Sequence, residues 1–229
     1  MEEAEFDKYA LEYEGLLRKH IAVTGEDPSF FAEYKIKLFS KWTQPAPLSV
    51  VDFGSGIGNS IPYFRKHFAG SEITCADVSQ RSLAHASRRF PGPERSLIIS
   101  QEGIPCPDES FDAAFSACVF HHIPHEEHDF WLKELLRVTR PGGAIVIFEH
   151  NPFNPLAVHA VKTCPFDENA RLIRASRLRA RCRDAGWRDL RTQYHIYFPN
   201  FLAGLRPIEP MLGGIPMGAQ YSLFGRKPS

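Results

Sequence analysis

The residues most suited to binding a ligand lie in the segment LSVVDFGSGIGNS, residues 48–60. An aliphatic run leads to Asp52, and glycines follow at alternate positions, Gly54, Gly56 and Gly58. A strand that enters a glycine-rich turn and then a helix is the arrangement with which α/β proteins bind nucleotide-like ligands. The segment therefore predicts such a site.

Asp52 argues against a dinucleotide at this turn. Its carboxylate would repel a diphosphate, and no Lys or Arg lies between Leu48 and Arg65 to offset that charge. The third glycine of a G-x-G-x-x-G fingerprint is also missing, because Asn59 or Ile61 stands there, depending on which glycine starts the pattern. A ligand with a cationic group near the turn fits better. S-adenosylmethionine (SAM) is such a ligand, since it carries an ammonium and a sulfonium beside its adenosine.

Asp77 ends the next apolar run, EITCAD. A carboxylate at this place can accept hydrogen bonds from both hydroxyls of a ribose, and it would serve NAD as well as SAM. Asp77 could also cap the helix expected after Ser79, and the two roles are not exclusive.

Histidines and one glutamate follow two later strands and could supply a general base. CVFHHIPHEEH contains His121 and His122, and FEHNPFNP contains Glu149 and His150. Transfer of a methyl group to a hydroxyl benefits from a base, and a neutral imidazole suits that role. We expect the base to be His121 or His122, with Glu149 and His150 as second candidates. The alternatives are packing against the following helix and hydrogen bonding within a proline-rich turn.

The same histidine-rich segment does not predict a metal site. His125 and His128 are three positions apart instead of the four of H-E-x-x-H, and no cysteine pair supports them. We therefore expect no bound metal.

The elements that must position these residues alternate from Leu48 onward. Strands are expected at 48–52, 72–77, 96–100, 111–117 and 143–149, with helices at 58–68, 79–89 and 125–138. Such alternation predicts a parallel sheet with helices on both faces, and a ligand at the carboxyl ends of the strands where strand order reverses. An Arg-rich helix is expected near 175–185. The later runs 192–198 and 219–225 lack a clear crossover helix, so they are expected to be antiparallel.

The N-terminal residues 1–44 are expected to form a helical cap, because apolar residues recur there every three or four positions. That cap would either pack on the core or act as a lid that excludes water. Residues 45–229 are expected to form the SAM-binding domain, in one compact unit with the cap.

Four segments in order resemble the class I SAM-dependent methyltransferases, particularly the small-molecule type 11 group. They are VVDFGSGIGNS, ITCADVS, IPCPDESFDAAFSACVFHHIP and LLRVTRPGGAIVIFEHN, and the resemblance covers roughly residues 48–150. It implies an enzyme with a Rossmann-like, seven-stranded, mostly parallel sheet whose last strand is antiparallel. The cofactor would be SAM and the product S-adenosylhomocysteine (SAH).

The resemblance also assigns roles to cofactor-binding residues. Asp52 and the three glycines, Gly54, Gly56 and Gly58, would hold the methionine portion. Asp77 would hold the ribose and Val78 would pack on the adenine. Many relatives place an Asp near the start of the adenine segment, where this chain has Ser100 and Gln101, which could make the adenine hydrogen bonds instead. Cys118, after the fourth strand, completes the expected set.

Composition limits the partners. The chain is 43% hydrophobic and 24% charged, which is typical of a soluble globular protein. Its 27 basic and 27 acidic residues give a formal net charge of zero, so no nucleic-acid partner is expected. The five scattered cysteines form no C-x-x-C pair, the start is acidic without an apolar run, and the aliphatic runs are too short to cross a membrane. Together these features favour a cytoplasmic protein, whose oligomeric state the sequence leaves open.

The expected function is methyl transfer from SAM to a small molecule, with O-methylation slightly preferred over N-methylation because of the histidines. The stretches 149–170 and 197–202 resemble bacterial methyltransferases that accompany glycosyltransferases or secondary-metabolite enzymes, which favours a sugar or natural-product intermediate as acceptor. The alternatives are a non-catalytic SAM-binding module and, less favoured, an NAD-dependent oxidoreductase. Eight arginines between positions 171 and 191 leave room for a protein or RNA acceptor, although such a cluster is more often a solvated helix face.

Overall fold

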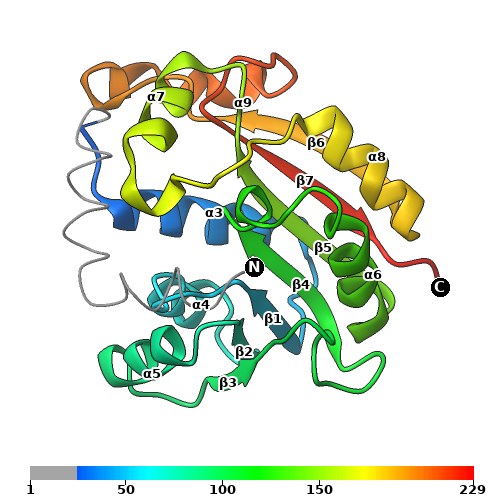
Figure 1. Cartoon of the computed structure of the whole chain (residues 1–229). Helices are drawn as coiled ribbons and strands as arrows, with labels where there is room; N and C mark the ends of the chain where they lie inside the picture. Colours follow the sequence, from blue (N-terminus) through cyan, green and yellow to red (C-terminus); the bar gives the residue numbers. More distant parts are fainter. Residues whose placement is uncertain (1–24) are drawn as a thin grey trace.

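A seven-stranded sheet in the order β3-β2-β1-β4-β5-β7-β6 organises residues 25–229, the part of the chain that the computed structural model describes (Figure 1). Its strands are β1 Ser49–Phe53, β2 Glu72–Asp77, β3 Arg95–Ile98, β4 Phe111–Ala117, β5 Thr139–His150, β6 Arg188–His195 and β7 Gln220–Arg226. Only β7 runs antiparallel to its neighbours in this sheet, β5 and β6. The predicted fold class, including the reversed last strand, is confirmed.

Helices connect the strands and follow local signals in the sequence. They are α3 Pro28–Trp42, α4 Ile61–His67, α5 Gln80–Arg89, α6 His128–Val138, α7 Pro155–Thr163, α8 Ala175–Ala185 and α9 Glu209–Leu212, with 3₁₀ segments η2 Phe120–His122, η3 Pro165–Asp167 and η4 Asn200–Ile208. Asp27 caps α3 ahead of a proline at its first position, and Ser79 caps α5 by accepting the Ser82 N–H. Gly186, with φ 116°, ends α8 in the left-handed region that favours glycine.

Two hydrophobic cores lie on opposite faces of the sheet because successive strand residues point to opposite sides. Val51 belongs to the core that α6 and α8 cover. Val50 belongs to the core that α3, α4 and α5 cover. The same alternation near the end of β5 places Ile147 in the first core and Phe148 in the second. Parity therefore separates the next two residues, Glu149 and His150, between the two faces.

Most expected elements form within a few residues of their predicted bounds, and 72–77 and 111–117 agree fully with β2 and β4. The Arg-rich helix predicted near 175–185 is α8. Three differences stand out. β5 begins at Thr139, α7 forms where only a proline-rich turn was expected, and the Gly/Pro-rich link before β7 contains η4 and α9. The first part of the predicted cap, residues 1–24, lies outside the described residues.

Strand order reverses between β1 and β4, since β2 and β3 lie on one side of this pair and β5 to β7 on the other. The carboxyl ends of β1 and β4 therefore meet at the point where open α/β sheets bind ligands. None of the helices within residues 25–229 has the length and apolar character needed to span a bilayer.

Candidate active site

A cavity of about 300 Å³ lies at the carboxyl ends of β1 and β4. Six of the nine residues predicted to bind the cofactor line it: Asp52, Gly54, Gly56, Asp77, Val78 and Cys118. Three of the four predicted catalytic residues also line it: His121, His122 and His150. The fold thus brings both predicted sets to one cavity.

Asp52, near the end of β1, is a buried acid with one carboxyl oxygen that no described residue contacts by a hydrogen bond. Its side chain is 2% exposed, and its Oδ2 atom has no hydrogen-bond partner within residues 25–229. Burial, reinforced by the nearby carboxylate of Asp77, raises the pKa of Asp52 to about 8, although the charge of Lys35 opposes this shift. A buried acceptor that faces a cavity suits a cationic hydrogen-bond donor from a ligand.

The glycine-rich turn after β1 has a backbone conformation that residues with a side chain rarely adopt. Gly54 has φ 75°, and a Cβ there would collide with the side chain of Val119. Gly56 has φ 52° and donates its N–H to Asp77 Oδ2 at 2.8 Å. A Cβ added to Gly56 would meet nothing within 4 Å, so the turn leaves a cradle at this point.

Asp77 is almost fully buried at the end of β2 and anchors the turn. Its Oδ2 accepts from Gly56, and its Oδ1 accepts the N–H of Ser79 at 2.9 Å. The cap of α5 is Ser79 itself, so the alternative role of Asp77 as helix cap is wrong. A carboxylate has about four acceptor positions, which leaves capacity for ribose hydroxyls.

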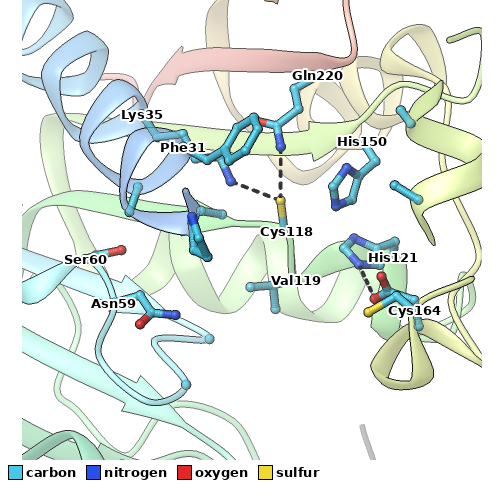
Figure 2. Close-up of a pocket in the computed structure, with 18 of the residues that line it drawn as sticks. Phe31, Lys35, Asn59, Ser60, Cys118, Val119, His121, His150, Cys164 and Gln220 are labelled. Carbon is cyan, nitrogen blue, oxygen red and sulfur yellow. Dashed lines mark hydrogen bonds and ion pairs between the residues drawn. The ribbon is translucent and has the colours of Figure 1, made fainter. Parts of the chain in front are cut away.

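Lys35 and Cys118 form a polar contact in the cavity that joins α3 to the end of β4 (Figure 2). Lys35 Nζ donates to Cys118 Sγ at 3.1 Å, and Gln220 Nε2 lies 3.9 Å from the same sulfur. Cys118 has φ 59°, which is uncommon for a residue with a side chain. Burial would raise the pKa of this thiol, but the ammonium of Lys35 and the imidazole of His150 lower it to about 6. These contacts favour the thiolate form of Cys118.

A buried chain of hydrogen bonds holds His121. Its Nδ1 lies 2.6 Å from Glu149 Oε2, and its Nε2 lies 3.4 Å from Asp167 Oδ1. The other oxygen of Glu149 accepts the backbone N–H groups of Val119 and Phe120 at 3.0 and 2.7 Å. Glu149 consequently fixes both the backbone after β4 and the ring of His121.

The pKa values of this cluster diverge because two carboxylates surround one ring. Burial opposes charge on His121, but Glu149 and Asp167 outweigh it and raise its pKa well above the usual range. Burial, together with the charge on His121, lowers the pKa of His122. Burial would raise the pKa of Asp167, but its contacts with both histidines lower it instead. Within the protein alone, His121 is thus the charged imidazole and His122 the neutral one.

Four predicted site residues lie away from the cavity lining. Gly58, with φ 78°, packs against α4 and α5, while Ser100 and Gln101 lie in an exposed turn after β3. Their assignments to the cofactor stay predictions. Glu149 was expected to project toward the acceptor, whereas its carboxylate is 1% exposed and bonded to His121 and to backbone. Its place on the face of Ile147 explains this difference.

The structure also adds lining residues that the sequence did not single out. Lys35 of α3 brings a cation to the cavity, although the sequence has no Lys or Arg between Leu48 and Arg65. Asp167 brings a carboxylate from η3. The remaining histidines of the segment bond to backbone. His128 Nε2 donates to the carbonyls of Phe120 and Ile123 at 2.8 and 3.0 Å, and His125 Nε2 to that of Arg171 at 3.2 Å. A sequence signal for Asp167 is lacking, since it lies far from the histidines along the chain.

Known proteins share both the motifs and the fold of this site. Residues 51–147 match the family described as a methyltransferase domain, and this stretch contains the glycine turn, Asp77, Cys118 and His121. Residues 51–147 are therefore a methyltransferase domain of this family.

Curated relatives of this methyltransferase domain act on different compounds. The chain is 32% identical over 112 residues to a demethylmenaquinone methyltransferase of Thermus thermophilus, which is 48% of this chain and 50% of that protein. It is 31% identical over 111 residues to a 2-methyl-6-phytyl-1,4-hydroquinone methyltransferase of Synechocystis, which is 48% of this chain and 34% of that protein. The matched stretch therefore spans half or less of these relatives.

A solved structure resembles nearly the whole chain. It is a Thermotoga maritima protein described as a SAM-dependent methyltransferase, possible histamine N-methyltransferase, with a TM-score of 0.72 and 22% sequence identity. The superposition covers 98% of this chain and 99% of that one. This similarity extends the methyltransferase fold beyond residues 51–147, to the C-terminal strands and helices.

Proposed function

We propose that this protein binds SAM in the cavity and transfers its methyl group to a hydroxyl of a small molecule. The observation that carries the proposal is the buried Asp52 beside the cradle at Gly56, in one cavity with a wall of histidines. An acceptor atom that has no partner among residues 25–229 and an open cradle fit the ammonium and carboxylate of the methionine portion. Both features are properties of this chain, independent of its relatives.

The residues of β1 and β2 would hold the cofactor. Asp52 Oδ2 would accept a hydrogen bond from the ammonium, and the open space at Gly56 would let the backbone approach the methionine portion. Asp77 would accept hydrogen bonds from the ribose, and Val78 would pack on the adenine. When bound, SAM supplies an electrophilic methyl carbon, so that an O–C bond forms, the S–C bond breaks and its electron pair stays on sulfur in SAH.

The histidine wall would orient the acceptor and take its proton. His121 is held as a charged ring by Glu149 and Asp167, so it is suited to orientation and not to proton removal. His122 and His150 line the cavity beside it and can accept the hydroxyl proton. In-line positioning of the oxygen and methyl carbon supplies much of the acceleration in such displacements.

The apolar part of the lining sets the class of acceptor. Phe31, Leu156, Ala160 and Ile196 line the cavity together with the polar residues. Such a lining suits a small molecule that carries a hydroxyl on an apolar body, so within the predicted class of sugar or natural-product intermediates we favour a natural product. We further propose that α3 covers one side of the cavity as part of the predicted cap, because its residues Phe31 and Lys35 line it.

A calorimetric titration of the purified protein with SAH, with NAD as control, tests the cofactor. Binding of SAH alone is expected, and binding of NAD alone would overturn the proposal. A panel of sugars, phenols and amines with SAM, assayed for SAH release, then tests the transfer. Turnover of hydroxyl compounds supports O-methylation, turnover of amines alone contradicts it, and SAH binding without any turnover would favour a non-catalytic module.

A further inference from the structure

Three side chains that share the cavity wall form a cluster with the composition of a metal site. His121, His122 and Asp167 each offer one ligand atom, and these atoms all lie within 4.8 Å of one another. Asp167 Oδ1 is 3.4 Å from His121 Nε2 and 3.2 Å from His122 Nε2. All three residues line the cavity, so the cluster is open on that side.

The separations suit one small ion. Ligand atoms at about 2.0–2.2 Å from a tetrahedral ion are about 3.3–3.6 Å apart, which matches the distances of both histidines from Asp167. The pair of histidine nitrogens lies within 4.8 Å, so side-chain rotation would have to bring them closer for both to bind the same ion. Two imidazoles and one carboxylate are donors for zinc, iron or cobalt, whereas magnesium and calcium prefer oxygen alone.

The surroundings of His121 favour one ring orientation. Glu149 Oε2 accepts from His121 Nδ1 at 2.6 Å, so Nε2 is the nitrogen that faces Asp167, and a metal ion that displaces its proton would bind there. Glu149 is in turn fixed by two backbone N–H groups. A carboxylate that orients the far nitrogen of a histidine is a recurrent feature of metal centres. Glu149 and Asp167 thus contact opposite nitrogens of the His121 ring, and only Asp167 lies on the side where the ion would bind.

We propose that His121 Nε2, His122 Nε2 and Asp167 Oδ1 bind one first-row divalent transition-metal ion, with a further coordination position open to the cavity. The site itself stands on these contacts. Its role rests on the proposed function: the open position would bind the acceptor's hydroxyl oxygen and favour loss of its proton, which would leave His150 to receive that proton. The proposal also reverses the expectation of no metal, because Asp167 was not visible as a partner in the sequence.

Cobalt(II) is the probe that tests the site. The full chain, with any affinity tag removed, is dialysed against chelator and titrated with cobalt(II), and its visible absorption and bound metal are measured. One cobalt per chain with the intense bands of a low-symmetry site is expected. Absence of such a signal, or metal that washes off on gel filtration, would overturn the proposal and leave the histidines as an ion-pair network that holds protons.

Variants place the ion within the chain. Asp167→Asn and His122→Gln should each weaken cobalt affinity by roughly 100-fold or more, and Glu149→Gln by about 10–100-fold, because it retains the oxygen for the backbone but loses the acceptor for His121. His125→Gln is the matched control and should leave the affinity unchanged, since its ring bonds to the Arg171 carbonyl. Equal affinity in Asp167→Asn and wild type would refute the site.

A parallel titration with SAH separates this proposal from the proposed function. Wild type and the metal-site variants should bind SAH alike, which also shows that the variants fold. SAH binding without cobalt binding removes the metal and leaves methyl transfer standing. Cobalt binding without SAH binding keeps the site and removes the function to which its role was tied.

Discussion

Replacing Asp52 by Asn should weaken cofactor binding while it stabilises the empty protein. Removal of one partner of a buried ion pair costs about 3–5 kcal/mol. In wild type, Asp52 must lose its proton at pH 7 to pair with the ammonium. Because its pKa is about 8, this ionisation costs about 1.4 kcal/mol, which reduces the net gain from the ion pair. The net loss of about 2–3.5 kcal/mol corresponds to a roughly 30- to 400-fold weaker affinity for SAH.

The stability change has the opposite sign because burial raises the pKa of Asp52. The folded carboxyl holds its proton more tightly than the unfolded one, so the wild-type free energy of unfolding falls as pH rises from about 4 to about 8. With a pKa of 3.8 when unperturbed and about 8 in the fold, this loss reaches about 4 kcal/mol at pH 7. Asn does not titrate, so the unliganded variant should melt about 10 °C higher at pH 7 and gain little near pH 4.

Two measurements on the same samples check these effects. Calorimetric titration with SAH gives the affinity, and thermal unfolding without ligand at pH 4, 6 and 8 gives the stability. Asp112→Asn is the matched control on β4. Its carboxylate accepts from Leu48, Ser49 and Arg140. Burial would raise its pKa, but the contacts with Arg140 and Ser49 lower it, so loss of the carboxylate should destabilise the fold and spare SAH binding.

An Asp52→Asn variant that binds SAH as tightly as wild type would refute the ammonium contact. A variant that melts lower than wild type at pH 7 would refute the assignment of a raised pKa. The melting result also bears on the expected affinity, because the cost of ionising Asp52 follows from the same raised pKa.

Three other predictions concern the rest of the cavity. Asp77→Ala should weaken SAH binding roughly 10- to 100-fold through loss of charge-assisted hydrogen bonds, and an unchanged dissociation constant would remove the ribose assignment. Cys118 should react with iodoacetamide with a midpoint near pH 6, more slowly once SAH is bound, and Lys35→Met should move that midpoint upward; an unmoved midpoint would contradict the ammonium–thiolate contact. Replacing His121 and His122 together by Gln should lower turnover of a hydroxyl acceptor about 10²–10⁴-fold with little effect on SAH affinity, and full activity would exclude both from the reaction.

Sequence alone predicted the parts of the molecule that depend on neighbouring residues. The spacing of apolar residues predicted the strands. The glycines after Asp52 predicted the turn, because a turn with positive φ favours glycine whatever the rest of the fold. The order of strands and helices also placed Asp77 and Cys118 correctly at the carboxyl edge of the sheet. The sequence alone did not predict α7. Asn154 caps this helix by accepting the Ala157 N–H, but the two prolines of the segment led us to expect only a turn.

The tertiary structure decided which side chains meet. Glu149 and His150 looked equivalent in the sequence, yet their consecutive places on β5 send one into the buried contact with His121 and the other to the cavity. Asp167 reaches the histidines because the chain after α7 returns to the carboxyl edge of the sheet, and Lys35 reaches Cys118 because α3 packs beside it. These contacts join residues far apart in the chain. They depend on strand order and helix packing, which no local pattern of residues records.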